Sequence, residues 1–288
     1  MYMRFKELKS QLWLFNFRRL IHRSVRRSVA PILIHQMGKV GSSSLARALG
    51  AIEGLPPVCQ IHFLSRIERA KARENFKKWN REIPNHLKAS DYLSSIIEQE
   101  ISENLVWPVV TIVRDPVARQ LSDVFQNPEI IGCKAGESPD PIKVLDFLQT
   151  YCRNFDEAND YICNWINNEF IQYWNIPVYE NPFDEAKQFE LIKTNRVRAL
   201  ILRLEDFPNS ITNEAVFQSW LQRPIRLTAT QENAAASRKS FDSYRQVLSK
   251  LSIPRKYLEK VYSSRYSRHF YGESRSQLIQ KWSGDLSN

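Results

Sequence analysis

The strongest constraint on the fold lies in residues 31–45, PILIHQMGKVGSSSL, where an apolar run leads into a lysine between two glycines and then into three serines. The run predicts a buried strand, the glycines a tight turn, and the serines the first turn of a helix. Backbone N–H groups at a helix N-terminus lack partners within the helix and attract anions. We therefore expect a phosphate- or sulfate-binding site here. Its residues would be Gly38, Lys39, Gly41, Ser42, Ser43 and Ser44.

The order of residues in this loop separates it from a nucleotide-triphosphate P-loop. That loop reads G-x-x-x-x-G-K-[ST], and its final hydroxyl holds Mg²⁺. Here Lys39 stands two positions before Gly41, so no Lys-Ser/Thr pair is present. The lysine would reach an anion from the mouth of the loop, and we predict no metal site. Glycine- and serine-rich turns also occur without a ligand, which leaves a purely structural interpretation of the loop open.

A second anion-binding segment follows another apolar run, Val109–Val113, which is typical of a strand buried on both faces. Arg114 comes at the carboxyl end of this predicted strand. Asp115 can cap the next helix and a proline follows at its first position, which places Ser122 about two turns along. Arg114 and Ser122 are therefore candidates to bind a phosphate. The structural alternative for Arg114 is a salt bridge at the helix start.

Arg119 lies on the same predicted helical face as Ser122, three residues before it. Two interpretations stay open for this arginine. It could contact the ligand, or it could pair with Asp115 or Asp123.

The two motifs, in this order, resemble the 5′-phosphosulfate loop and the 3′-phosphate element (here RDPVARQLS) of sulfotransferases. These enzymes transfer a sulfuryl group from 3′-phosphoadenosine 5′-phosphosulfate (PAPS). The segments HFLS, IPVYENPFD (176–184), RALILRLEDF (198–207) and HFYGE (269–273) are similar to a bacterial sulfotransferase-related family named for capsular polysaccharide synthesis. The resemblance spans roughly residues 31–283.

This resemblance implies a three-layer, P-loop-type α/β fold with a mostly parallel central sheet flanked by helices. It implies sulfuryl transfer from PAPS to a hydroxyl of a carbohydrate or glycoconjugate, with 3′-phosphoadenosine 5′-phosphate (PAP) as the product. It also places the basic segment 233–239 near the nucleotide, where Arg238 and Lys239 are the available cations unless they are only solvated surface charge. The aromatic residues that could stack on adenine, or else belong to the core, are Trp107, Phe125 and Tyr244.

The proposed reaction requires two catalytic tasks. Lys39 is the candidate to stabilise charge on the oxygen that leaves with the nucleotide. His62, in HFLS, is the candidate general base, since an imidazole accepts a proton near neutral pH. Glu205 and Glu53 remain alternative bases, and a histidine hydrogen-bonded to the backbone is the structural alternative for His62. His35, inside the first predicted strand, is expected to be structural. His269 could face the active site, but its spacing does not indicate this.

Composition favours one packed domain over residues 31–288. Hydrophobic residues make up 43% of the 288-residue chain, and its four cysteines form no C-x-x-C motif or metal-ligand spacing. Buried thiols in a reducing, cytoplasmic compartment are the expectation. No stretch approaches 18 apolar residues and no N-x-[ST] sequon occurs, which disfavours a membrane-anchored form.

Residues 1–30 form a basic arm with eight Lys or Arg residues against Glu7, a net +7 of the total +10. Phe5, Leu8, Leu12 and Phe15 recur at helical spacing, which predicts an amphipathic helix. Two interpretations stay open. The helix packs on its own domain with a solvated basic face, which we favour, or it contacts an anionic membrane surface from the cytoplasmic side.

Along the remaining chain, apolar and turn patterns predict a second strand at 58–64 and, after the strand at 109–113, a fourth at 197–204. They also predict a surface loop at 127–141 and helices elsewhere, including 66–80, 90–104, 144–150 and 157–174. Two other functional classes compete with the sulfotransferase. One is a kinase for nucleotides or phosphosugars. The other is a noncatalytic basic protein that binds membranes or nucleic acid, although the charge lies in one short arm without a nucleic-acid motif. The sequence indicates neither the acceptor, be it a carbohydrate polymer or a glycolipid, nor the oligomeric state.

Overall fold

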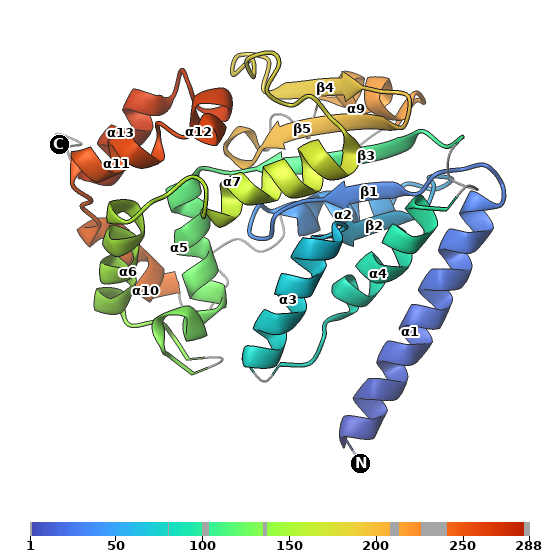
Figure 1. Cartoon of the computed structure of the whole chain (residues 1–288), viewed down its shortest axis with the longest axis horizontal. Helices are drawn as coiled ribbons and strands as arrows, with labels where there is room; N and C mark the ends of the chain where they lie inside the picture. The colour runs from blue at the N-terminus through green and yellow to red at the C-terminus, as the bar shows by residue number, and fades with distance from the viewer. Residues whose placement is uncertain are drawn as a thin grey trace.

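A five-stranded sheet forms the centre of the protein in the computed structural model, which describes residues 2–79, 81–99, 104–134, 137–207, 213–225 and 241–284 (Figure 1). The strands are β1 (Ile32–His35), β2 (Val58–Ile61), β3 (Trp107–Val113), β4 (Phe189–Lys193) and β5 (Val197–Arg203). Their order is β2-β1-β3-β5-β4, and only β4 runs antiparallel to its neighbour. The predicted mostly parallel α/β fold is confirmed.

The central strands consist of β-branched and other apolar residues that are buried on both faces. Every residue of β1 and of β3 is buried, as expected for a parallel sheet covered on two sides. In Figure 1, α4 (Asn85–Ile97) and α7 (Tyr161–Trp165) pass in front of the sheet, whereas α2 (Ser42–Gly50) and α9 (Glu214–Leu221) lie behind it. Helices therefore cover both faces and leave the strand ends as the place for a site.

The other helical segments complete these layers. They are α1 (Tyr2–Val25), α3 (Arg66–Lys78), α5 (Pro116–Gln126), η2 (Pro128–Ile131), α6 (Pro141–Arg153), the π-helix η3 (Ile166–Gln172), η4 (Leu204–Asp206), α10 (Phe241–Lys250), α11 (Arg255–Val261), α12 (Arg265–Phe270) and α13 (Arg275–Ser283). The π-helix continues α7 directly, so residues 161–172 form one rod in front of the sheet.

Several sequence-based boundaries differ from the structure. The strand predicted at 58–64 ends at Ile61 because the next residues turn away to meet a buried carboxylate, described below. The helix predicted from residue 90 begins at Asn85, after the extended Pro84, and ends at Ile97. The predicted loop at 127–141 contains η2. The sequence analysis missed β4, whose residues are only partly buried at the sheet edge.

The four cysteines are free thiols. Cys59, Cys152 and Cys163 are buried, as expected, whereas Cys133 is partly exposed.

Candidate functional site

The loop between β1 and α2 has the backbone geometry of an anion-binding turn. Gly38, Lys39 and Gly41 all have positive φ, at 20°, 69° and 75°. Gly41 caps α2 without any side-chain hydrogen bond, so the first N–H groups of this helix are not capped by a side chain. Its positive φ favours glycine, and a Cβ on Gly41 would lie 2.6 Å from a methyl carbon of Leu204 and would have to displace that side chain.

The three serines occupy the first turn of α2. Ser42 is buried, and its Oγ accepts a hydrogen bond from the side-chain amide of Gln60 at 2.7 Å. Its hydroxyl hydrogen can still be donated to an anion. Ser43 and Ser44 are partly exposed at the same helix start. This turn therefore combines uncapped backbone donors with hydroxyl donors.

Arg114 joins the two predicted anion-binding segments. Its Nη1 donates a hydrogen bond of 2.7 Å to the backbone carbonyl of Lys39. The Tyr266 hydroxyl accepts from the Arg114 backbone N–H and donates to the Arg114 carbonyl, at 3.1 and 2.9 Å. Because β1 and β3 are adjacent parallel strands, their carboxyl ends bring the loop and the arginine side by side.

Asp115 caps α5 as predicted, since its Oδ1 accepts from the N–H groups of Val117 and Ala118. The same carboxylate accepts hydrogen bonds from the Tyr262 hydroxyl and the Trp282 indole, both at the C-terminal end of the chain. The turn that carries Arg114 is thus held by α11–α13, and no local pattern connects these distant residues to Arg114.

The other residues predicted for the second segment have separate outcomes. Ser122 is partly buried on α5. Arg119 pairs with Asp123 at 2.9 Å and stacks over the Tyr161 ring at 4.6 Å, so the pairing alternative describes it. Arg238 and Lys239 lie outside the described residues.

Among the aromatic residues considered for adenine, Trp107 is fully buried and belongs to the core. Phe125 and Tyr244 are partly buried, and their ring centroids lie 5.2 Å apart. Phe125 stands one turn beyond Ser122 on α5, so this aromatic pair borders the second segment.

His62 is the first residue after β2. Its Nδ1 lies 2.9 Å from both the backbone carbonyl oxygen and the side-chain Nε2 of Gln36. Both tautomers of a neutral ring therefore find a partner at Nδ1. The tautomer that donates from Nδ1 to the carbonyl leaves the lone pair of its own Nε2 to accept a proton.

Burial, with smaller contributions from the nearby His86 and Lys39, lowers the pKa of His62 from 6.5 to about 3, although the hydrogen bond to the Gln36 carbonyl opposes the shift. The ring centroids of His62 and His86 lie 4.7 Å apart. Burial, followed by Lys39, also lowers the pKa of His86. The Lys39 ammonium thus acts on both imidazoles, which are neutral at physiological pH.

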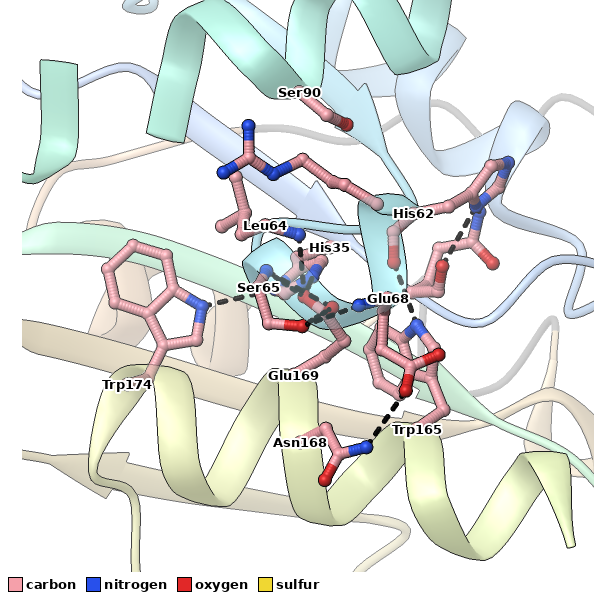
Figure 2. A network of polar contacts seen from close by, with 12 residues as sticks. His35, His62, Leu64, Ser65, Glu68, Ser90, Trp165, Asn168, Glu169 and Trp174 are labelled. Atoms are coloured by element: carbon pink, nitrogen blue, oxygen red, sulfur yellow. Dashed lines mark hydrogen bonds and ion pairs between the residues drawn. The ribbon is translucent and has the colours of Figure 1, made fainter. Parts of the chain in front are cut away.

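Glu169 fixes the segment that follows His62, as Figure 2 shows. This fully buried carboxylate accepts from the N–H of Leu64 at 2.6 Å, from the N–H and Oγ of Ser65 at 3.1 and 2.6 Å, and from His35 Nε2 at 3.1 Å. Burial alone would raise its pKa, but the hydrogen bonds from His35, Ser65 and Leu64 hold the pKa of Glu169 below its usual value. The carboxylate is therefore an ionised anchor inside the protein.

Two tryptophans from the same rod complete this network. The Trp165 indole donates to the His62 carbonyl at 2.8 Å, and the Trp174 indole donates to His35 Nδ1 at 3.1 Å. Since His35 Nδ1 accepts, His35 is neutral and its Nε2–H faces Glu169. The expected structural role of His35 is confirmed. The pattern of residues 157–174 predicted a helix but gave no sign that Glu169 points inward.

The alternative bases are not equivalent. Glu53 lies between the C-terminal end of α2 and the start of β2. It is therefore near the amino ends of the strands, whereas the loop between β1 and α2 lies at their carboxyl ends, and Glu53 is no candidate. Glu205 follows β5 at the site edge, where its carboxylate accepts from the Asp115 N–H and the Tyr271 hydroxyl at 2.8 and 3.0 Å. His269 instead lies 3.5 Å from Glu190 on β4 and packs edge-on against Tyr179, so it is not brought to the site.

Within the described part of the chain, no three His, Cys, Asp or Glu side chains gather as metal ligands would.

A family described as "NKWYS: Putative capsular polysaccharide synthesis protein" matches residues 143–272 of the chain, somewhat under half of it. The matched part contains the rod with Glu169, the sheet strands β4 and β5, and Tyr266. It excludes the anion-binding loop, His62 and Arg114. Comparisons with curated proteins and with solved structures found no match.

Proposed function

We propose that the protein is a PAPS-dependent sulfotransferase that acts on a hydroxyl of a carbohydrate or glycoconjugate. The observation that carries the proposal is the hydrogen bond from Arg114 to the Lys39 carbonyl, which holds this arginine beside the N-terminus of α2. A donor with anionic groups on both sides of its ribose needs two anion-binding groups close together, and the start of α2 and Arg114 would supply them. The match to a family named for capsular polysaccharide synthesis supports a carbohydrate acceptor.

The loop residues suit the end of the donor that carries the transferred group. The N–H groups and hydroxyls at the start of α2 would hold the 5′-phosphosulfate, and Gly38, beside which a Cβ would meet nothing within 4 Å, leaves room for it. Arg114, with Ser122 further along α5, would hold the 3′-phosphate. Arg238 and Lys239 remain proposed additional contacts.

Sulfuryl transfer forms a bond between the acceptor oxygen and sulfur while the bond from sulfur to the 5′-phosphate oxygen breaks. Lys39 would stabilise the negative charge on the departing oxygen, which is worth about 10²–10³ in rate for one well-placed donor. His62 would take the acceptor proton on Nε2, with Nδ1–H held by the Gln36 carbonyl. Its low pKa keeps the ring unprotonated but also makes it a weak base, so proton transfer requires that substrate binding raise this pKa. The developing imidazolium would be favoured by the anions bound beside it.

Transfer of label from radiolabelled PAPS to a panel of glycans, glycolipids and phenols, read by mass and by label, tests this proposal. We expect label in a carbohydrate hydroxyl without added Mg²⁺. Lys39→Ala should lose roughly 10²–10³ of the rate while keeping PAP binding, and the exposed Lys143→Ala serves as the charge-matched control. Phosphate transfer from ATP·Mg²⁺ to the same panel would instead favour the kinase and contradict the proposal, as would an unchanged rate in Lys39→Ala.

A further inference from the structure

Helix α1 packs on the domain through one side only. Ile21 and Val25 are buried in the core, and Phe17 meets the Tyr92 ring of α4 edge-on at 6.3 Å. Ser10 donates a hydrogen bond of 2.6 Å to Asn85 at the start of α4. In Figure 1 the N-terminal part of α1 extends past the other helices. These contacts identify the side of α1 that faces the domain, and the opposite side therefore faces away from it.

The apolar residues that predicted an amphipathic helix lie on that opposite side. Leu8, Leu12 and Phe15 are spaced by four and three residues, which aligns them on one stripe, and they are 62%, 61% and 62% exposed. The helix does pack on its own domain, as expected, but through a face other than the one formed by Leu8, Leu12 and Phe15. Three large apolar side chains in a row, left open, are unusual for a surface that only meets water.

Basic residues continue the same stripe toward the domain. Arg19 follows Phe15 by four positions and Arg23 follows Arg19 by four, and both are exposed. Residues 7–27 carry six Lys or Arg against Glu7 alone. These residues carry a net +5, half of the chain's net charge of +10, on and directly after the helix that exposes the apolar stripe. Long arginine side chains can reach polar headgroups while an apolar face enters the lipid below them.

We propose that α1 docks the protein on an anionic phospholipid surface, with Leu8, Leu12 and Phe15 in the headgroup region and the arginines on the lipid phosphates. The combination of basic and apolar side chains favours a lipid surface over the other possible partners of this helix face. A second copy of this helix would bring two strongly basic segments together, and nucleic acid would leave the apolar stripe in water. Among the described residues no helix, α1 included, is long and apolar enough to cross a membrane, so the helix would lie along the surface.

The docking surface is connected to the candidate site through α4. Asn85, held by Ser10 of α1, directly precedes His86, which packs against His62. The proposed membrane contact does not depend on the proposed sulfotransferase function.

Co-sedimentation of the full chain with vesicles tests the docking. We expect binding to phosphatidylcholine vesicles that contain phosphatidylglycerol and little binding to phosphatidylcholine alone. The triple variant Leu8→Ser/Leu12→Ser/Phe15→Ser should bind at least about tenfold more weakly, because it loses the contact of three large apolar side chains with the lipid. Arg19→Gln/Arg23→Gln should lose roughly fivefold per charge.

The control removes comparable exposed apolar surface elsewhere, at Ile67 on α3 and Ile142 on α6, which are 64% and 76% exposed. Ile67→Ser/Ile142→Ser should bind vesicles as the wild type does. All these side chains are exposed, so unchanged circular dichroism and thermal unfolding would establish that each variant folds.

Three outcomes would overturn the proposal. The wild type sediments no more with phosphatidylglycerol vesicles than without vesicles, the triple serine variant binds as tightly as the wild type, or the stripe instead mediates a dimer that the triple variant abolishes. Sulfuryl transfer to soluble glycans does not require membrane docking. Failure of the vesicle test would therefore leave the proposed function standing, and the two tests are distinguishable.

Discussion

The substitution Glu169→Gln tests the buried anchor behind His62. The carboxylate uses Oε2 for His35, Leu64 and Ser65, and Oε1 for Ser65 alone. Glutamine supplies one oxygen and no charge. With that oxygen at the Oε2 position, the Ser65 hydroxyl loses its acceptor and the other three donors keep only a weaker, uncharged one; at the Oε1 position, His35 and Leu64 lose theirs. Each unsatisfied buried group costs about 1–3 kcal/mol, which gives a loss of about 3–5 kcal/mol in the free energy of unfolding.

Urea unfolding measures this loss. We expect the midpoint of Glu169→Gln to fall by roughly 1–2 M. The matched control is Glu68→Gln, one turn into α3, because its Oε1 accepts from Lys71 and Asn168 and a glutamine oxygen can keep those bonds. This control should cost less than about 1 kcal/mol. Equal midpoints for the two variants would refute the assigned role of Glu169.

The pH dependence gives a second readout of the same anchor. The pKa of Glu169 lies below 4.5, so its ionised form stabilises the folded state above the unfolded value and this stabilisation is lost as the pH falls through the folded pKa. The difference between wild type and Glu169→Gln should therefore shrink as the pH is lowered below about 4.5. A difference that stays constant down to pH 3 would contradict an ionised carboxylate.

Three further predictions concern the site itself. Gly41→Ala should weaken PAP binding at least tenfold, because alanine is strained at positive φ and its Cβ would meet Leu204; calorimetry checks this, and wild-type affinity would contradict it. The pKa of His62 falls from 6.5 to about 3 on folding, so its contribution is present above pH 6.5 and is lost on acidification; the melting temperature of the wild type should drop more between pH 7 and pH 4 than that of His62→Gln, and parallel curves would contradict it. Tyr266→Phe removes both hydrogen bonds that brace Arg114 and should weaken PAP binding more than ADP binding, whereas an equal loss for the two nucleotides would reject that bracing role.

Local patterns were enough to predict the parallel sheet, the tight turn between β1 and α2, and the helix cap at Asp115. Each depends on neighbouring residues: apolar runs, positive-φ glycines and a proline after an aspartate. Residues that act across the chain could not be found this way. Glu169 lies in an ordinary helical pattern 105 positions after Leu64, to which it binds, and no local rule marks it as buried.

Arg119 and α1 illustrate the same limit. The sequence placed Arg119 on the helical face of Ser122, and only the packing of Asp123 and Tyr161 around it decides that it is structural. The spacing of Leu8, Leu12 and Phe15 predicted a helix correctly but could not indicate which face meets the domain. Periodicity gives the presence of a face, and tertiary contacts decide its partner.

Calorimetric titration with PAP and with ADP, both without Mg²⁺, tests most directly whether the two anion-binding segments serve one nucleotide. PAP has a 3′-phosphate that ADP lacks, and a charge-assisted contact from Arg114 should make PAP bind roughly 10–100-fold more tightly. Arg114→Ala should abolish this preference, and Arg255→Ala, an exposed arginine paired only with Glu259 among the described residues, should preserve it. Equal affinity of the wild type for PAP and ADP would contradict the account.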